Sequence, residues 1–131
     1  MSKYLVKGNK IFNGIIPRYQ NLIPTTLYNN SSGSNGTITL SDNITNYSYV
    51  EIYFRTNDGA GFRGSQKIEV VNGANAISLQ FIHPVSGNYY IKAREVQIAG
   101  TRLTTLSAKE IYSGGMSDSN YIYITKILGY K

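Results

Sequence analysis

The residues that could do chemistry in this sequence are few, and they do not combine into a known catalytic set. His83 is the sole histidine, it precedes Pro84, and cysteine is absent. A zinc site needs three or four ligands drawn from cysteine, histidine and carboxylate side chains. The Gly-X-Ser-X-Gly motif that presents a nucleophilic serine is missing as well. We therefore expect no metal, no cofactor and no catalytic residue.

The seven carboxylates are the remaining candidates for catalysis. Glycoside cleavage needs two carboxyl groups that are close in space, and sequence spacing neither requires nor reveals such a pair. Asp42 and Asp58 fit turns, and the four glutamates fit exposed strand positions beside Arg or Lys. A polysaccharide-cleaving enzyme is therefore retained as the least favoured functional hypothesis.

Tyrosine and basic side chains suggest binding rather than catalysis. The chain contains 12 tyrosines and no tryptophan. Tyrosine gives a binding surface apolar area at low entropic cost, and aromatic rings with basic groups on one sheet face can hold nucleic acid or glycan. No nucleic-acid signature is present, so nucleic acid is not favoured, and ordinary cross-strand pairs explain the pattern too. We expect an exposed polar-aromatic, ligand-binding face that comprises Tyr49, Tyr53, Arg55, Arg63, Lys92 and Arg94.

The charge balance favours anionic partners. Thirteen Lys and Arg residues against seven Asp and Glu give a formal charge of +6, and such an excess attracts phosphate polymers, acidic glycans or nucleic acid. The basic residues are scattered, so a solvated surface explains the charge as well. No apolar run has the roughly 18 residues that span a membrane, and the first residues do not resemble a secretory signal. We expect synthesis in a cytoplasm and no membrane partner.

Period-two alternation predicts strands along most of the chain. In residues 47–56, Val50, Ile52 and Phe54 alternate with polar or aromatic neighbours, as in a half-buried strand. The clearest hairpin signal is the Asn-Gly-Ala-Asn sequence at 72–75, between expected strands at 67–71 and 76–82. Strands are also expected at 89–98, at 101–112 in preference to a helix, and at 121–128, with a flexible loop at 113–120. In the last strand we place Ile122, Ile124 and Lys126 on one side.

The fold class that follows is all-β. Eight or nine short strands joined by Gly and Asn turns predict an antiparallel β-sandwich or jelly-roll-like domain over residues 31–131. Residues 1–30 differ, because short apolar pieces are broken by Gly-Asn pairs and two prolines, and a polar loop follows at 29–36. We interpret residues 1–30 as an arm that anchors the domain or as a pair of edge strands.

Two segments carry a resemblance to a known family. The sequence SSGSNGTITLSDNITNYSYVEIYFRTNDG and the terminal YIYITKILGYK resemble the distal domains of bacteriophage tail-fibre and baseplate proteins, chiefly from phages of Gram-positive hosts. In that family a Gly/Ser loop leads into a TITLSD strand pair, and a strand ending in GYK closes the chain. The resemblance covers roughly residues 31–56 and 119–131, and its motifs are structural, so no family binding residue transfers to this chain.

The resemblance implies a homotrimeric β-domain on an outer virion appendage. We expect a virion structural protein without enzymatic activity that attaches the particle to a host cell-wall glycan or teichoic-acid-like polymer. The alternative is an architectural head-fibre, collar or decoration subunit without a ligand. In both cases residues 1–30 would contact other virion proteins.

Overall fold

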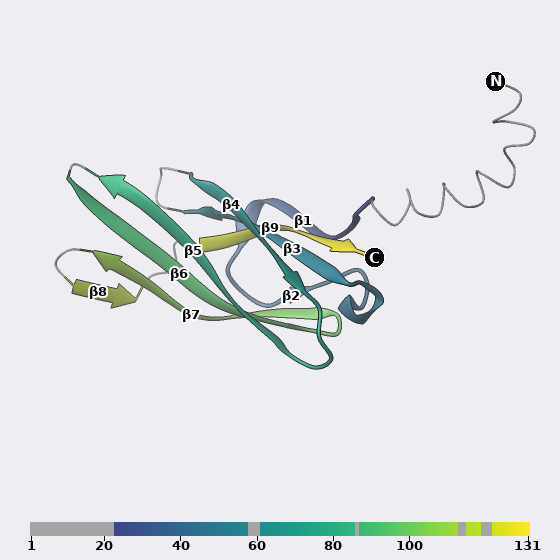
Figure 1. The fold of residues 1–131 in the computed structure, drawn as a ribbon. Helices are drawn as coiled ribbons and strands as arrows, with labels where there is room; N and C mark the ends of the chain where they lie inside the picture. The colour runs from purple at the N-terminus through teal and green to yellow at the C-terminus, as the bar shows by residue number, and fades with distance from the viewer. Residues whose placement is uncertain (1–22, 58–60, 86, 113–114, 119–121) are drawn as a thin grey trace, which may run out of the picture.

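Nine β-strands in two antiparallel sheets account for most of the described chain (Figure 1). The computed structural model describes residues 23–57, 61–85, 87–112, 115–118 and 122–131. The first sheet has the order β1 (Thr25–Ser34), β9 (Ile122–Tyr130), β3 (Tyr49–Thr56) and β4 (Arg63–Glu69). In the second sheet, β2 (Ile38–Thr39), β7 (Arg102–Tyr112), β6 (Asn88–Ala99) and β5 (Asn75–Val85) are neighbours in that order, and β8 (Gly115–Asp118) also pairs with β7. The predicted β-sandwich is confirmed.

The core lies between the two sheets and is built from the inward residues of alternating strands. Val50, Ile52 and Phe54 of β3 are at most 4% exposed, as the period-two pattern predicted. They meet side chains of the second sheet and of the β2 region, because a strand with one apolar face must bury it against another layer. The second sheet's contribution to this core comprises Ile38, Ile77, Leu79, Val96, Ile98 and Leu103.

The last strand departs from simple alternation. The pairing register between β3 and β9 shifts after the Tyr53–Lys126 pair, so that Phe54 pairs with Ile124. This bulge at Thr125 reverses the sides of the residues beyond it. Ile127 is consequently buried at 0% exposure, while Lys126 is only partly buried. The prediction that Lys126 shares a side with Ile122 and Ile124 is wrong for this reason.

The residues of the SDNITNY motif form a corner between β2 and β3. Asp42 accepts hydrogen bonds from the Asn43 amide, the Asn46 side chain and the Tyr47 hydroxyl, at 2.7–2.9 Å. Asn43 caps the short 3-10 helix η1 (Ile44–Asn46). The Tyr47 ring packs on Gly129 so closely that a Cβ at Gly129 would lie 2.6 Å from it. The two motifs therefore meet in space and hold the corner against β9.

Three sequence predictions about connections are wrong. Residues 67–71 and 76–82 do not form a hairpin, because β4 pairs with β3 while β5 pairs with β6 in the other sheet. Asn75 turns the chain between the sheets through hydrogen bonds with both backbone groups of Val71. The expected loops at 29–36 and 113–120 also contain strand, since β1 continues to Ser34 and residues 115–118 form β8.

The described part of the chain begins within the predicted N-terminal arm. Residues 25–30 belong to β1, which pairs with β9 at the edge of the first sheet. Residues 1–22 of the predicted arm lie outside the described residues. Within the described part of the chain, no helix has the length and apolar character needed to span a membrane.

The two sheets differ in extent. Figure 1 shows the ends of β5 and β6 that meet at their shared turn, together with β8 and the end of β7, reaching past the first sheet. The buried apolar residues of these strands all lie in the other half, where the first sheet covers them. The part of the second sheet that the first sheet covers thus encloses the core. We call the part that reaches past the first sheet the extension.

Candidate functional site

The outward face of the first sheet gathers tyrosines and cations from three neighbouring strands. We call it the tyrosine–cation face and define it as Tyr49, Glu51, Tyr53 and Arg55 of β3, Arg63, Ser65 and Lys67 of β4, and Tyr123, Lys126 and Tyr130 of β9. The strand register brings these residues together. Tyr49 pairs with Tyr130, Tyr53 with Lys126, and Arg55 with Tyr123 across β3 and β9. Glu51 pairs with Lys67 across β3 and β4.

Cations lie over the rings of this face. The Lys67 Nζ is 4.0 Å from the Tyr130 ring centre and 5.3 Å from that of Tyr49. The Lys126 Nζ is 4.3 Å from the centre of the Tyr53 ring. A lysine ammonium within about 6 Å of an aromatic ring centre is attracted to the negative face of the ring. These contacts hold two otherwise mobile ammonium groups at defined positions on the sheet.

Glu51 lies at the centre of the face and fixes the tyrosine hydroxyls. Its Oε1 accepts hydrogen bonds from Tyr53 at 2.9 Å and from Tyr130 at 2.8 Å, and its Oε2 accepts one from Ser65 at 3.3 Å. Both carboxylate oxygens therefore have partners within the protein. Such a network keeps the rings in one orientation, because each hydroxyl would lose a charge-assisted hydrogen bond by moving.

The network shifts the ionisation of its members. Burial alone raises the pKa of Glu51, but the hydrogen bonds from Tyr130, Tyr53 and Ser65 and the nearby Lys67 charge outweigh it and lower the pKa below its ordinary value. The same bond to Glu51, together with burial, raises the pKa of Tyr130 to about 12. At neutral pH Glu51 is therefore ionised, and its partners Tyr53 and Tyr130 are neutral.

Arg55 has a structural role at one end of the face. Its guanidinium donates to the Ser32 backbone carbonyl through Nε at 3.2 Å and through Nη2, and its Nη1 donates to the Thr56 carbonyl at 3.1 Å. It also lies 5.5 Å from the Tyr123 ring centre. Because these donors bind β1 and the end of β3, Arg55 ties the edge strand to the sheet. Arg63, opposite Arg55 on β4, is exposed.

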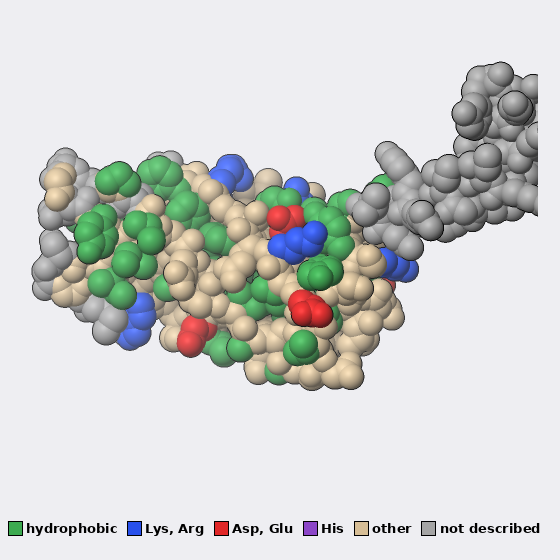
Figure 2. All heavy atoms as spheres, viewed as in Figure 1, with side chains coloured by type: hydrophobic (Ala, Val, Ile, Leu, Met, Phe, Trp, Pro, Cys, Tyr) green, Lys and Arg blue, Asp and Glu red, His purple; other side chains and the backbone are tan. Residues whose placement is uncertain are grey.

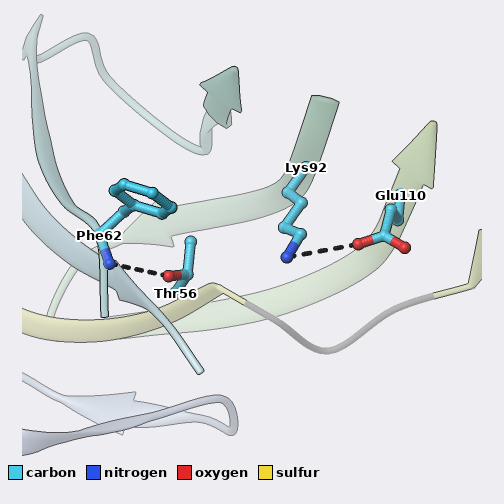
Figure 3. A network of polar contacts seen from close by, with 4 residues as sticks. All are labelled: Thr56, Phe62, Lys92 and Glu110. Carbon is cyan, nitrogen blue, oxygen red and sulfur yellow. Dashed lines mark hydrogen bonds and ion pairs between the residues drawn. The ribbon is translucent and has the colours of Figure 1, made fainter. Parts of the chain in front are cut away.

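Lys92 and Arg94 do not belong to this face, which corrects the prediction that they are exposed. Both lie on β6 in the second sheet and face inward, at 4% and 2% exposure. The Lys92 Nζ is 3.4 Å from Glu110 of β7, and the two side chains point toward each other in Figure 3. The Arg94 Nε donates to the Ile122 carbonyl of β9 at 2.8 Å. They connect strands and sheets inside the protein.

Figure 3 also shows how the β3–β4 connection is closed. The Phe62 amide donates to the Thr56 hydroxyl at 3.0 Å, and the Thr56 amide donates to the Phe62 carbonyl at 2.8 Å. The Phe62 ring then lies 6.1 Å from Phe81 of β5. These contacts join the first sheet to the second where the extension begins.

An exposed apolar patch lies on the outward face of the extension. Ile82 pairs with Ile91, and Ile91 pairs with Ile111, so three isoleucines cross β5, β6 and β7 in one row. Ile82 and Ile111 are 66% and 42% exposed, and the neighbouring Tyr89 is 63% exposed. Figure 2 shows hydrophobic side chains gathered at this end of the molecule, on the left of the view. We call this row, with Tyr89, the isoleucine patch.

The groups considered for catalysis are scattered. The described residues contain no cluster of three His, Cys, Asp or Glu side chains that could hold a metal ion. An open hollow of about 220 Å³ is lined by β5, β6 and Leu106 of β7, and Glu95 is its single ionisable residue. His83 is on β5 opposite Tyr90, and its side chain lies outside the described part of the structure.

Sequence reasoning found Tyr49, Tyr53 and Arg55 of β3 and Arg63 of β4, and it missed the other residues of β4 and all those of β9. The alternation at 65–67 offered a signal for Ser65 and Lys67, since they pair with Tyr53 and Glu51 once the β3–β4 hairpin is known. Lys126 and Tyr130 had no such signal, because their side of the sheet depends on the bulge in β9.

Comparison with known proteins adds no relative. No protein-family model matches the chain, and no curated protein matches it.

Proposed function

We propose that this chain is a non-enzymatic structural domain of an outer phage appendage, of the tail-fibre or baseplate type, that binds a host surface polymer through the tyrosine–cation face. The observation that carries the proposal is the face itself. One sheet surface presents tyrosines together with lysines that their rings hold in place. A flat surface of this kind suits an extended polymer, whereas a small substrate needs a concave pocket.

The resemblance to phage appendage domains supports the same function. The residues that carry it, in the SDNITNY and GYK motifs, form the corner in which Tyr47 packs on Gly129. This corner fixes β9 against β3, the two strands that provide most of the face. The motif residues thus act as structure, and the polymer-binding residues lie beside them on the sheet surface.

A cell-wall binding assay tests the proposed function. Fluorescently labelled full-length protein is incubated with a panel of Gram-positive cells and with their purified walls, and bound label is measured against protein concentration. We expect saturable binding to a subset of the panel, reduced by replacing Tyr49 and Tyr53 with serine. Absence of saturable binding to every wall in the panel would contradict the proposal.

The isoleucine patch favours a second candidate function, that of an architectural subunit that assembles with copies of itself. Exposed isoleucines in a row across three strands are typical of a protein interface. The chain has a net charge of +6, so two copies repel each other wherever their charged surfaces meet. The three isoleucine positions carry no charge, and contact through them brings the least repulsion. A homotrimer that buries this patch would also place three tyrosine–cation faces on one particle, which raises the avidity for a polymer.

Sedimentation velocity tests this assembly. We expect the wild-type protein to sediment as a trimer at micromolar concentration, and the variant Ile82→Ser with Ile111→Ser to sediment as a monomer. Because both side chains are exposed in the single chain, the double variant should keep the wild-type circular dichroism spectrum. A wild-type protein that stays monomeric at high concentration would contradict the architectural function.

A further inference from the structure

We infer that the tyrosine–cation face recognises its polymer by anionic groups, phosphate or carboxylate, and does not bind by stacking sugar rings or nucleobases on its tyrosines. This inference rests on the proposed function and names the chemical class of the ligand. It follows from what already occupies the ring faces, the hydroxyls and the carboxylate of the site.

The ring faces are occupied by the protein's own cations. Lys67 lies over Tyr130, Lys126 lies over Tyr53, and Arg55 lies over Tyr123, with distances to the ring centres of 4.0, 4.3 and 5.5 Å. A sugar or a base that stacks on a tyrosine needs the same ring surface. Tyr53 and Tyr130 therefore each have a lysine ammonium within 4.3 Å of the ring centre in place of an open ring, and the contact of Arg55 with Tyr123 is looser.

The hydrogen-bonding groups between the rings are also engaged. The hydroxyls of Tyr53 and Tyr130 donate to Glu51, and Ser65 donates to the other carboxylate oxygen. Neutral glycans are recognised by hydroxyl, amide and carboxylate groups that exchange hydrogen bonds with sugar hydroxyls. At the centre of the face these groups bind one another, so they are less available to a neutral sugar.

The ammonium groups of Lys67 and Lys126 remain available to bind a ligand. A lysine ammonium has three N–H donors, and a ring contact leaves those on the solvent side available. Among the described residues, neither Lys67 nor Lys126 forms an ion pair with a carboxylate. The face carries four cationic side chains, Arg55, Arg63, Lys67 and Lys126. Its carboxylates are Glu51 at the centre and Glu69 at the edge, which lies opposite Tyr49 on β4 with an exposed side chain. An anionic polymer matches this excess.

Tyr49 is the most exposed tyrosine of the face. It is 43% exposed, and Lys67 lies 5.3 Å from its centre. One tyrosine supports a single stacking contact, whereas binding of single-stranded nucleic acid uses several aromatic platforms in succession. The exposed ring of Tyr49 therefore does not alter the inference that the ligand is anionic. The variant Tyr49→Ser serves as a control for binding by stacking.

The test uses the full-length protein and four immobilised polymers, measured by biolayer interferometry. Poly(glycerol phosphate) carries phosphate, polygalacturonate carries carboxylate, dextran is neutral, and poly(dT) carries phosphate with bases. We expect binding to one or both of the first two polymers and none to dextran. Affinity should fall about tenfold or more between about 50 and 300 mM salt, because exposed charges are screened. The stronger of the two anionic polymers identifies the anion.

Matched variants locate the binding to this face. Lys67→Gln with Lys126→Gln should weaken binding about tenfold, while Lys67→Arg with Lys126→Arg should keep it. The control Arg102→Gln with Lys109→Gln removes two charges from the outward face of β7 in the second sheet and should change affinity less than about twofold. Equal losses in the two glutamine pairs would show that net charge alone drives binding, and would overturn the inference.

Two further outcomes separate this inference from the proposed function. Binding to dextran, or binding to poly(dT) that is tighter than to both other anionic polymers and is lost in Tyr49→Ser, overturns the anionic class and leaves polymer attachment standing. Absence of binding to all four polymers, together with absence of binding to cell walls, removes both proposals. Binding to walls alone, unaffected by salt, overturns the inference only.

Discussion

Two strands of this protein carry similar rows of aromatic and basic residues, with opposite results. On β3, Tyr49, Tyr53 and Arg55 point outward from the first sheet. On β6, the row Tyr90, Lys92 and Arg94 points inward, and its two cations are at most 4% exposed. Both rows combine tyrosine with arginine at positions an even number of residues apart, so the difference comes from which face of each strand the opposite sheet covers.

The two rows also use their charges differently. On β3 and its neighbours the cations lie over rings and next to solvent, where they remain available to a ligand. On β6 each cation binds an internal partner, Glu110 for Lys92 and the Ile122 carbonyl for Arg94. We therefore expect the solvent-facing lysines Lys67 and Lys126 to determine binding, and the inner row to determine stability.

The largest effect is expected from breaking the Lys92–Glu110 ion pair. Lys92→Met leaves the Glu110 carboxylate, which is 15% exposed, without its cation, and should lower the free energy of unfolding by about 3 kcal/mol. Urea denaturation followed by circular dichroism measures this change. The double variant Lys92→Met with Glu110→Leu should recover most of the loss, because no buried charge is then left alone. A single variant as stable as the wild type would mean that the inner row does not determine stability.

The next largest effect is expected at Arg94, and it is measured against the loss of stability at the exposed Arg63. Arg94→Met removes a buried donor from the Ile122 carbonyl and should cost about 2 kcal/mol. Arg63→Met removes an exposed arginine of the tyrosine–cation face, on β4, and should change stability by less than about 0.5 kcal/mol. Chemical denaturation of both variants under the same conditions gives the comparison. Similar losses in the two variants would contradict the distinction between the rows.

A smaller effect is expected at Glu51 and depends on pH. Its pKa in the folded protein lies below the ordinary value of 4.5. The ionised form is therefore favoured by folding, and the resulting stability is present above that value and is lost as the pH falls through the folded pKa. Because Glu51 is partly exposed, Glu51→Gln should cost less than about 1 kcal/mol at neutral pH. The difference between variant and wild type in urea midpoint should shrink near pH 3, and a difference that is constant with pH would contradict it.

The smallest effect concerns Tyr130 and alkaline pH. Its pKa is raised to about 12, so its neutral form is favoured by folding. That contribution to stability is present below about pH 10 and is lost as the pH rises through about 12. The difference in phenolate absorbance between wild type and Tyr130→Phe should therefore appear near pH 12. A difference that appears near pH 10 would show that the bond to Glu51 does not hold in solution.

The strands were predictable where local alternation and the final burial agree. The β3 pattern was recovered because Val50, Ile52 and Phe54 are all apolar and all face one core. The strand at β7 was preferred over a helix for its threonine content, and the structure has Arg102–Tyr112 as a strand. The hairpin at 72–75 was wrong because an Asn-Gly turn signals a reversal but does not say which strands it joins. Here Asn75 redirects the chain into the other sheet.

The candidate site was predicted for β3 and for Arg63 of β4, and not for β9. Tyr49 and Tyr53 could be placed from their own strand, whereas Lys126 and Tyr130 required the register of β9. The register in turn depends on the bulge at Thr125. Threonine is common in regular strands, so the sequence gives no signal of a bulge there. Lys92 and Arg94 were misplaced because basic residues are almost always exposed unless they are paired, and their partners lie on β7 and β9.

The sequence by itself determined that this chain forms sheets, where most strands run, and that its surface is rich in tyrosine and positive charge. Those properties are local, because side-chain alternation and turn chemistry act over a few residues. Only the tertiary structure decided which of two similar rows faces water. That choice depends on the pairing of strands distant in the chain and on a one-residue shift in β9, which exchanges the two faces of a strand.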